Sequence, residues 1–233
     1  MIAVTFALRA ESSEFLRRLR AKTELERNGL KVVRGNAGHR MVEVLHTGVG
    51  EKVCVERVGK FLHDQQFDVL ISTGFAGALN DELQPGDLLL AKNFSTIDLD
   101  ERRLSTAASP IHKANLLTVP ELIDSSDERN RIARASGAAA VDMETEFIAR
   151  MCRERRIPLL SLRVVTDTPQ ERFPAPAHIL FDVAKQRTDL ANLAGFFLLH
   201  PQRVPRLLKF ARRITHARTI LANALVDVVE ALE

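Results

Sequence analysis

The chain has 233 residues, of which 45% are hydrophobic and 27% charged, so it can bury one full core. Its 33 basic and 30 acidic residues give a formal net charge of only +3, and this even balance argues against nucleic acid as a partner. The two cysteines, Cys54 and Cys152, form no CxxC or Cys/His cluster, which argues against a disulfide framework and against a metal site.

Short apolar runs alternate along the chain with segments of helical period, a pattern that predicts βαβ units and a covered sheet. The first half predicts a strand over 2–8, a helix over 12–22, a glycine-punctuated hairpin, a strand over 41–46, a helix near 53–62, and strands over 67–72 and 88–92. The second half predicts a flexible loop over 94–114, a short strand over 138–141, a helix after it, a strand over 157–165, a loop over 170–176 and a helical C-terminal part over about 178–233. We therefore expect one three-layer α/β domain over residues 1–233, with a mixed, mostly parallel central sheet covered by helices.

Polar or glycine-rich segments follow the predicted strands at their carboxyl ends. Glu11 follows the first strand, TGVG (47–50) the second and TGFAGA (73–78) the third. Asp142-Met143-Glu144 and Thr166-Asp167 follow two later strands. Each segment alone would also fit a helix cap or a tight turn. Because ligands of open α/β sheets bind beyond these ends, the shared location predicts one pocket.

The two glycine segments resemble no nucleotide-binding fingerprint. Neither has the spacing of GxGxxG, and no Walker lysine follows either of them. The sequence therefore disfavours a Rossmann dehydrogenase or a nucleotide triphosphatase, and we expect no cofactor.

Taken in order, six segments resemble the purine nucleoside/uridine phosphorylase family. They are ALRAE, TGVG, STGFAGAL, LQPGDLLLA, VDMET and RVVTD, between residue 7 and residue 167. They are most similar to the nucleosidases that hydrolyse 5′-methylthioadenosine and S-adenosylhomocysteine. The resemblance implies a nucleoside phosphorylase-like fold and an enzyme that hydrolyses the N-glycosidic bond of a purine nucleoside and releases adenine.

The resemblance also implies roles for three acidic residues. Asp167 would protonate or hydrogen-bond N7 of the leaving base, Glu144 would hold the ribose hydroxyls, and Glu11 would orient or deprotonate the attacking water. Glycosidic cleavage needs such a set, because positive charge builds on the sugar and negative charge on the base. The other residues expected to bind substrate are Thr73, Gly74, Phe75, Ala76, Gly77, Asp142, Met143, Arg163, Thr166 and Phe173, with Leu8 and Val49 in an apolar wall at the 5′ end of the sugar.

The sequence departs from the nucleosidases in two places. Asp142 stands where they usually carry Glu, and residues 117–126 lack the aromatic side chain that normally supports the base. Phe173 is the expected substitute for that aromatic platform. These departures bear on the identity of the substrate more than on the reaction.

Two other functions remain open at this point. A phosphate-dependent nucleoside phosphorylase is one, although no arginine precedes Thr73 and Glu11 would repel phosphate. Residues 129–145 and the helical tail also resemble the hopanoid-associated nucleoside phosphorylases, which act on a nucleoside with a long lipid at its 5′ carbon. The other is a non-catalytic nucleoside-binding protein, which the intact acid, ribose and water residues disfavour.

The two ends of the chain bear on location and assembly. The start, MIAVTFAL, has no basic leader, and the longest apolar stretch, 190–199, is too short to span a bilayer, so we expect a cytoplasmic protein. Residues 206–214 alternate apolar and basic faces; a helix that covers the sheet is favoured there over contact with a membrane surface. By analogy with the family we expect a homodimer.

Overall fold

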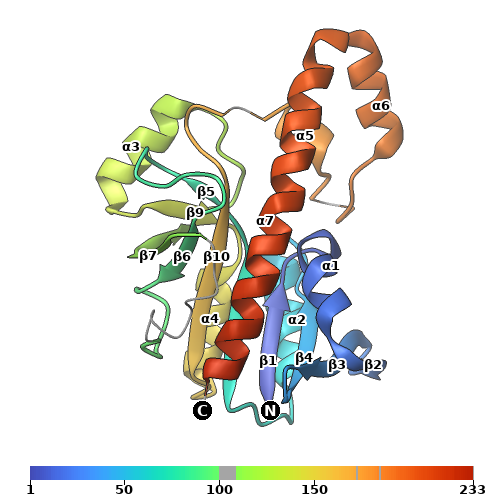
Figure 1. The fold of residues 1–233 in the computed structure, drawn as a ribbon, viewed down its shortest axis with the longest axis vertical. Coiled ribbons are helices and arrows are strands. Elements are labelled where there is room, and N and C mark those ends of the chain that lie inside the picture. The colour runs from blue at the N-terminus through green and yellow to red at the C-terminus, as the bar shows by residue number, and fades with distance from the viewer. Residues whose placement is uncertain (100–108, 172, 184, 233) are drawn as a thin grey trace.

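The computed structural model describes residues 1–99, 109–171, 173–183 and 185–232, and these form a ten-stranded mixed sheet with helices on both faces (Figure 1). The strands are β1 (Ile2–Phe6), β2 (Arg20–Arg27), β3 (Leu30–Ala37), β4 (Arg40–His46), β5 (Val69–Ala78), β6 (Leu88–Ala91), β7 (Ile111–Ala114), β8 (Leu116–Thr118), β9 (Ala140–Asp142) and β10 (Leu159–Asp167). The helices are α1 (Arg9–Arg18), α2 (Glu51–Leu62), α3 (Ser126–Ser136), α4 (Thr145–Glu154), α5 (Ala177–Leu180), α6 (Leu190–Leu199) and α7 (Val204–Ala231).

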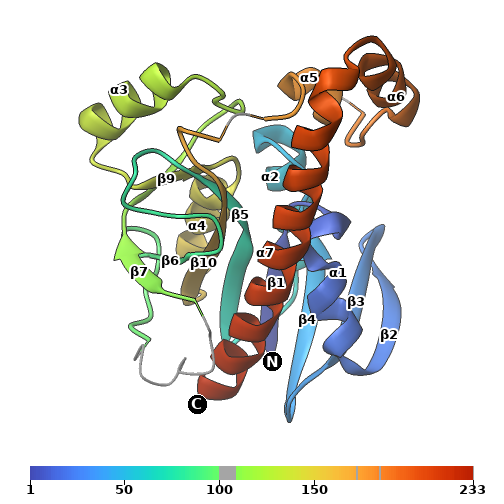
Figure 2. The same cartoon turned by 45° about the horizontal axis from the view of Figure 1, so that its top comes forward.

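The strand order is β2-β3-β4-β1-β5-β10-β6-β7, and β9 joins the far end of β5 with β8 beside it. The central strands β4, β1, β5 and β10 are parallel, whereas β2, β3 and β6 pair antiparallel with their neighbours. Helices α1 and α7 pack together on one face, and α2 and α4 on the other (Figure 2). The predicted α/β fold with a mixed sheet between helical layers is confirmed.

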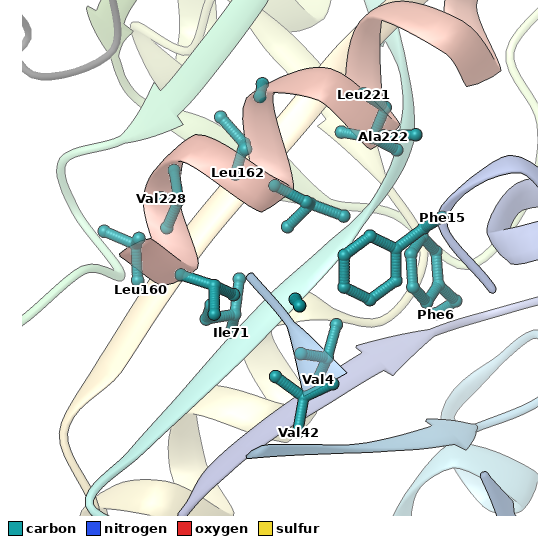
Figure 3. Packing of buried hydrophobic residues seen from close by; sticks show 14 of the residues in the cluster. Val4, Phe6, Phe15, Val42, Ile71, Leu160, Leu162, Leu221, Ala222 and Val228 are labelled. Carbon is teal, nitrogen blue, oxygen red and sulfur yellow. The ribbon is translucent and has the colours of Figure 1, made fainter. Parts of the chain in front are cut away.

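Alternate residues of the central strands pack on opposite faces of the sheet. Val4 and Phe6 of β1 join the core beneath α1 and α7, where Phe15 and Leu221 meet them (Figure 3). Ala3, between them in sequence, joins the second core beneath α2 and α4. Because both faces are covered, these strands read as continuous apolar runs rather than alternating ones.

Three boundaries differ from the prediction. Helix α1 ends at Arg18, and β2 begins at Arg20, inside the predicted helix. Strand β2 is charged and largely exposed, so its pairing with β3 rather than an apolar pattern determines it. Strand β7 lies in the predicted loop over 94–114 and pairs with β6; residues 100–108 of that loop lie outside the described residues. Helix α3 follows at residues the sequence analysis left unassigned.

The third difference concerns TGFAGA, which the sequence predicted as a turn and which belongs to β5. Strand β5 continues to Ala78 because β10 pairs with it through Gly77, and β9 pairs with its last two residues. This extension carries residues 73–78 beyond the end of β1, which stops pairing with β5 at Ser72. The extended strand forms the floor on which the candidate site is built.

Candidate active site

A small pocket opens where β1 ends beside the extended part of β5. Its residues come from β1, the loop after β4, β5, α4 and β10, which are far apart in the sequence. The lining residues are Thr5, Phe6, Ala7, Glu11, Thr47, Ser72, Thr73, Gly74, Phe75, Glu144, Ile148 and Arg163.

Glu11 lies in the first turn of α1, with its carboxylate in the pocket. One oxygen accepts a hydrogen bond from the Leu8 backbone N–H at 2.9 Å, which caps the helix. The other accepts from the Phe75 N–H at 3.1 Å, which fastens the helix to β5. Burial raises the pKa of Glu11, and these backbone hydrogen bonds and the charge of Arg163 only partly oppose the shift. Glu11 is thus both a helix cap and a rigidly held potential base.

Gly74 and Thr73 shape the floor beneath Glu11. Gly74 has φ near +150°, and a Cβ there would stand 3.0 Å from a carboxylate oxygen of Glu11, so only glycine fits. In the described part of the chain, the buried hydroxyl of Thr73 has no hydrogen-bond partner. A buried, unpartnered hydroxyl in a pocket is available to a ligand.

Glu144 precedes α4 and faces Glu11 across the pocket. Its carboxylate accepts a hydrogen bond at 3.1 Å from the backbone N–H of Gly50, the last residue of TGVG. Burial raises the pKa of Glu144 to about 8, and the negative charges of Asp142 and Glu11 add to the shift. Two buried carboxyl groups that disfavour each other's ionisation mark a place where a positive charge would be stabilised.

Asp142 and Arg163 form a buried ion pair beneath Glu144. Arg163 donates to Asp142 at 2.9 and 3.1 Å and to the hydroxyl of Ser72 at 2.8 Å. Asp142 also accepts from Thr118 and from the backbone and hydroxyl of Thr145. We expected Asp142 to bind substrate; in the structure its carboxylate is occupied by Arg163 and two threonines. It supports the turn that presents Glu144.

Asp167 ends β10 and is buried against a second arginine, Arg129 of α3. The guanidinium donates to Asp167 at 2.5 Å, to the Ala78 carbonyl at 2.9 Å and to the Ile123 carbonyl at 2.8 Å. The second oxygen of Asp167 accepts from the hydroxyl of Thr166 at 2.8 Å. Both oxygens of this carboxylate are therefore fixed in direction.

The register of β5 with β10 relates the two parts of the site. Gly74 lies beside Arg163 and Gly77 beside Asp167. A Cβ at Gly77 would stand 2.9 Å from Asp167, just as one at Gly74 would meet Glu11. Three residues of a strand span on the order of 10 Å, the length of a nucleoside. Glu11 and Glu144 share the pocket, whereas Asp167 lies farther along the same strand.

Phe173 lies in the loop after β10, close to the Asp167 end. Its ring packs edge-on against Phe210 of α7 at 6.0 Å, and the Arg129 guanidinium lies 6.0 Å from its centre. The ring is buried and adjoins the arginine that holds Asp167. Phe173 is therefore placed near the predicted base position, while Met143 is half-buried beside Glu144.

The predicted apolar wall is built differently on its two sides. Leu8 is half-buried at the start of α1. The Val49 backbone is held by Gln186, whose amide accepts from the Val49 N–H at 2.7 Å and donates to the Val49 carbonyl at 2.8 Å. A segment after α5 thus covers the TGVG loop.

Sequence reasoning did not single out Arg129 or Gln186. Arg129 is one of several arginines in a polar helix, and nothing in the pattern distinguishes the buried one from its exposed neighbours. Gln186 lies in an irregular segment that has no period. Both act through contacts between distant parts of the chain, which a single sequence does not reveal.

Comparisons with known proteins agree with this geometry. The family model described as "Phosphorylase superfamily" matches residues 1–114 and 101–198. A 5′-methylthioadenosine/S-adenosylhomocysteine nucleosidase of Staphylococcus aureus is 24% identical over 196 residues, which is 72% of this chain and 86% of the relative.

Two solved structures share the fold. A 5′-methylthioadenosine/S-adenosylhomocysteine nucleosidase of Campylobacter jejuni superposes with a TM-score of 0.72 at 19% identity and covers 99% of both chains. A futalosine hydrolase of Helicobacter pylori superposes with a TM-score of 0.69 at 15% identity and covers 99% of this chain and 97% of its own. At these identities the likeness establishes the fold alone.

Proposed function

The chain belongs to the phosphorylase superfamily, and we propose that it hydrolyses the N-glycosidic bond of a purine nucleoside such as 5′-methylthioadenosine or S-adenosylhomocysteine and releases adenine. The observation that carries the proposal is the placement of Glu11 and Glu144 in one pocket, with Asp167 farther along its floor. The name of the Staphylococcus aureus relative supports the same reaction.

The sugar lies, in this proposal, between Glu11 and Glu144. As the C–N bond breaks, positive charge grows on the ribose ring, and it meets two carboxyl groups whose ionisation burial disfavours. The developing cation offsets that penalty in the transition state more than in the neutral substrate, which lowers the barrier. Glu144 and the free hydroxyl of Thr73 bind the ribose hydroxyls.

The base lies toward Asp167 and Phe173. Asp167 hydrogen-bonds the base at N7, so that a proton reaches N7 as the bond electrons move onto the ring and adenine leaves neutral. Arg129 and Thr166 hold the two oxygens of Asp167 in the orientation that this transfer requires. Glu11 takes a proton from water, whose oxygen bonds to C1′ of the ribose.

Water rather than phosphate is the nucleophile in this proposal. Arg163 is the only arginine or lysine among the residues that line the pocket, and its charge is paired with Asp142. Phosphate would need an unpaired cation or several free donors, and it would be repelled by Glu11 and Glu144. The lining suits an uncharged nucleophile.

Assembly and location stay predictions. We expect a homodimer in which the neighbouring subunit closes the 5′ end of the sugar near Leu8 and Val49, and a cytoplasmic location. The mass of the protein in solution, measured by light scattering, tests the assembly.

The reaction is tested by release of adenine from methylthioadenosine, adenosylhomocysteine and adenosine, each with and without phosphate. The proposal expects adenine and a free sugar in phosphate-free buffer. A strict requirement for phosphate with a sugar 1-phosphate as product would instead identify a phosphorylase, and binding without turnover a non-catalytic protein.

A further inference from the structure

Helix α6 and the first half of α7 project beyond the sheet as a hairpin, at the edge toward which β1 runs (Figures 1 and 2). We call residues 190–216 the apolar hairpin. Phe197 is the only buried residue of α6, and the buried residues of α7 begin at Ala217. The preference for a helix that covers the sheet is therefore correct only for the second half of α7.

The apolar hairpin exposes large hydrophobic side chains. Leu198 is 82% exposed, Leu199 79% and Leu190 73%, and Leu208 and Val204 are also exposed. These are five of the eight large hydrophobic residues that are exposed in the described part of the chain. Exposed apolar residues that gather on one element mark a binding surface, whereas single ones do not.

The same segment concentrates the positive charge of the chain. Residues 190–226 contain six arginines and lysines and no acidic residue, so the remaining residues carry a net charge of −3. Arg206, Lys209 and Arg212 are exposed, and within the described residues none of them forms an ion pair. A leucine-rich tip bordered by unopposed cations complements a surface that has an apolar interior and anionic headgroups.

Two other occupants fit less well. A second copy that presented the same hairpin across a twofold axis would bring these cations together without acidic partners. In the described residues no helix is both long enough and apolar enough to cross a bilayer. Contact with one face of a membrane remains.

We propose that the apolar hairpin docks the protein on the surface of an anionic lipid bilayer. Leu198 and Leu199 enter the boundary between headgroups and acyl chains, and Arg206 and Lys209 face the headgroups. Gln186, just before the hairpin, holds the Val49 backbone at the edge of the candidate site. Docking would therefore bring that edge near the membrane.

The test is co-sedimentation of the full chain with vesicles of phosphatidylcholine, with and without phosphatidylglycerol. The proposal expects binding to the anionic vesicles at low salt and much weaker binding in about 1 M NaCl, where the Debye length is about 3 Å. Leu198→Glu with Leu199→Glu should weaken binding on the order of tenfold or more, because two buried apolar side chains are lost and two repulsive charges are added. Arg206→Glu with Lys209→Glu should weaken it through charge alone.

The matched controls are Lys22→Glu with Lys31→Glu, which change the same charge on the exposed β2–β3 hairpin, and Leu122→Glu, which changes an exposed leucine elsewhere. These should bind vesicles like the unchanged protein, and the melting temperature of every variant checks its folding. Lack of binding to anionic vesicles at low salt overturns the proposal. So does equal weakening by the control variants, or a dimer that Leu198→Glu converts to a monomer, which would assign the surface to a second copy. None of these outcomes depends on nucleoside hydrolysis.

Discussion

The two ends of the candidate site hold their carboxyl groups in opposite ways. Glu11 and Glu144 receive only backbone N–H groups, and their pKa values rise because burial outweighs those hydrogen bonds. Asp167 receives a guanidinium from Arg129 and a hydroxyl from Thr166. One end thus lacks positive charge and the other is already neutralised.

This difference matches the charges of glycosidic cleavage. The sugar end must stabilise a cation that exists only in the transition state, so a shortage of positive charge there is useful. The base end must direct a hydrogen bond to a flat ring, so fixed orientation matters more. The following changes test whether the two ends differ as described.

The largest effect is expected for Asp167→Asn. The rate with a purine nucleoside should fall by about 10²–10⁴ because the leaving base is no longer protonated. The stability should fall by roughly 3–5 kcal/mol because Arg129 is left buried without its partner. A riboside with p-nitrophenolate as leaving group, which needs no proton, should lose far less rate.

Asp142→Asn is the matched control, because it breaks the other buried pair of the site, with Arg163. It should lose similar stability and much less rate with the purine nucleoside. Equal loss of rate with the two leaving groups in Asp167→Asn would remove Asp167 from the protonation step.

Glu144→Gln should show the reverse combination, a slower reaction without a loss of stability. The pKa of Glu144 rises from an ordinary 4.5 to about 8, so the folded state prefers the protonated form. That contribution to stability is complete below pH 4.5 and is lost as the pH rises through 8. Gln cannot ionise, so the variant should melt higher than the unchanged protein above pH 8.

Melting temperatures across pH 4 to 9 measure this difference, together with the rate, which should fall by roughly 10²-fold for both leaving groups. Melting curves for the two proteins that keep the same separation at every pH would contradict the burial argument for Glu144.

A smaller effect is expected for two glycines of β5. Gly77→Ala places a methyl group 2.9 Å from Asp167, and Gly74→Ala places one 3.0 Å from Glu11. Each should lower the rate by about tenfold or more through displacement of its carboxyl group. Gly77→Ala alone should be relieved by the p-nitrophenolate leaving group; the same response in both variants would mean that the two ends do not act separately.

The smallest effect is expected for Gly195→Ala, the control for an added methyl group. A Cβ at this helical position meets nothing within 4 Å, so the variant should gain about 0.5–1 kcal/mol and keep its rate. Chemical denaturation measures the gain. A large loss of rate would show that glycine replacement is harmful at any position, which would weaken the comparison of Gly74 with Gly77.

The sequence predicted the layers and the acidic residues better than the backbone that carries them. Strand ends located Glu11, Glu144 and Asp167 because parallel strands bring their carboxyl ends to one edge. TGFAGA was misread because its glycines suggest a turn, although they serve to admit two carboxylates against a strand. Arg129 was missed because its burial depends on β5, β10 and the loop before α3, which are distant in the chain.

The most direct test of the central claim is a crystal structure with a stable, cationic analogue of a purine nucleoside. The account predicts the sugar nitrogen between the carboxyl groups of Glu11 and Glu144, the sugar hydroxyls at Glu144, and N7 of the base within hydrogen-bond distance of Asp167. An analogue that contacts Asp167 but lies away from Glu11 and Glu144, or the reverse, would contradict it.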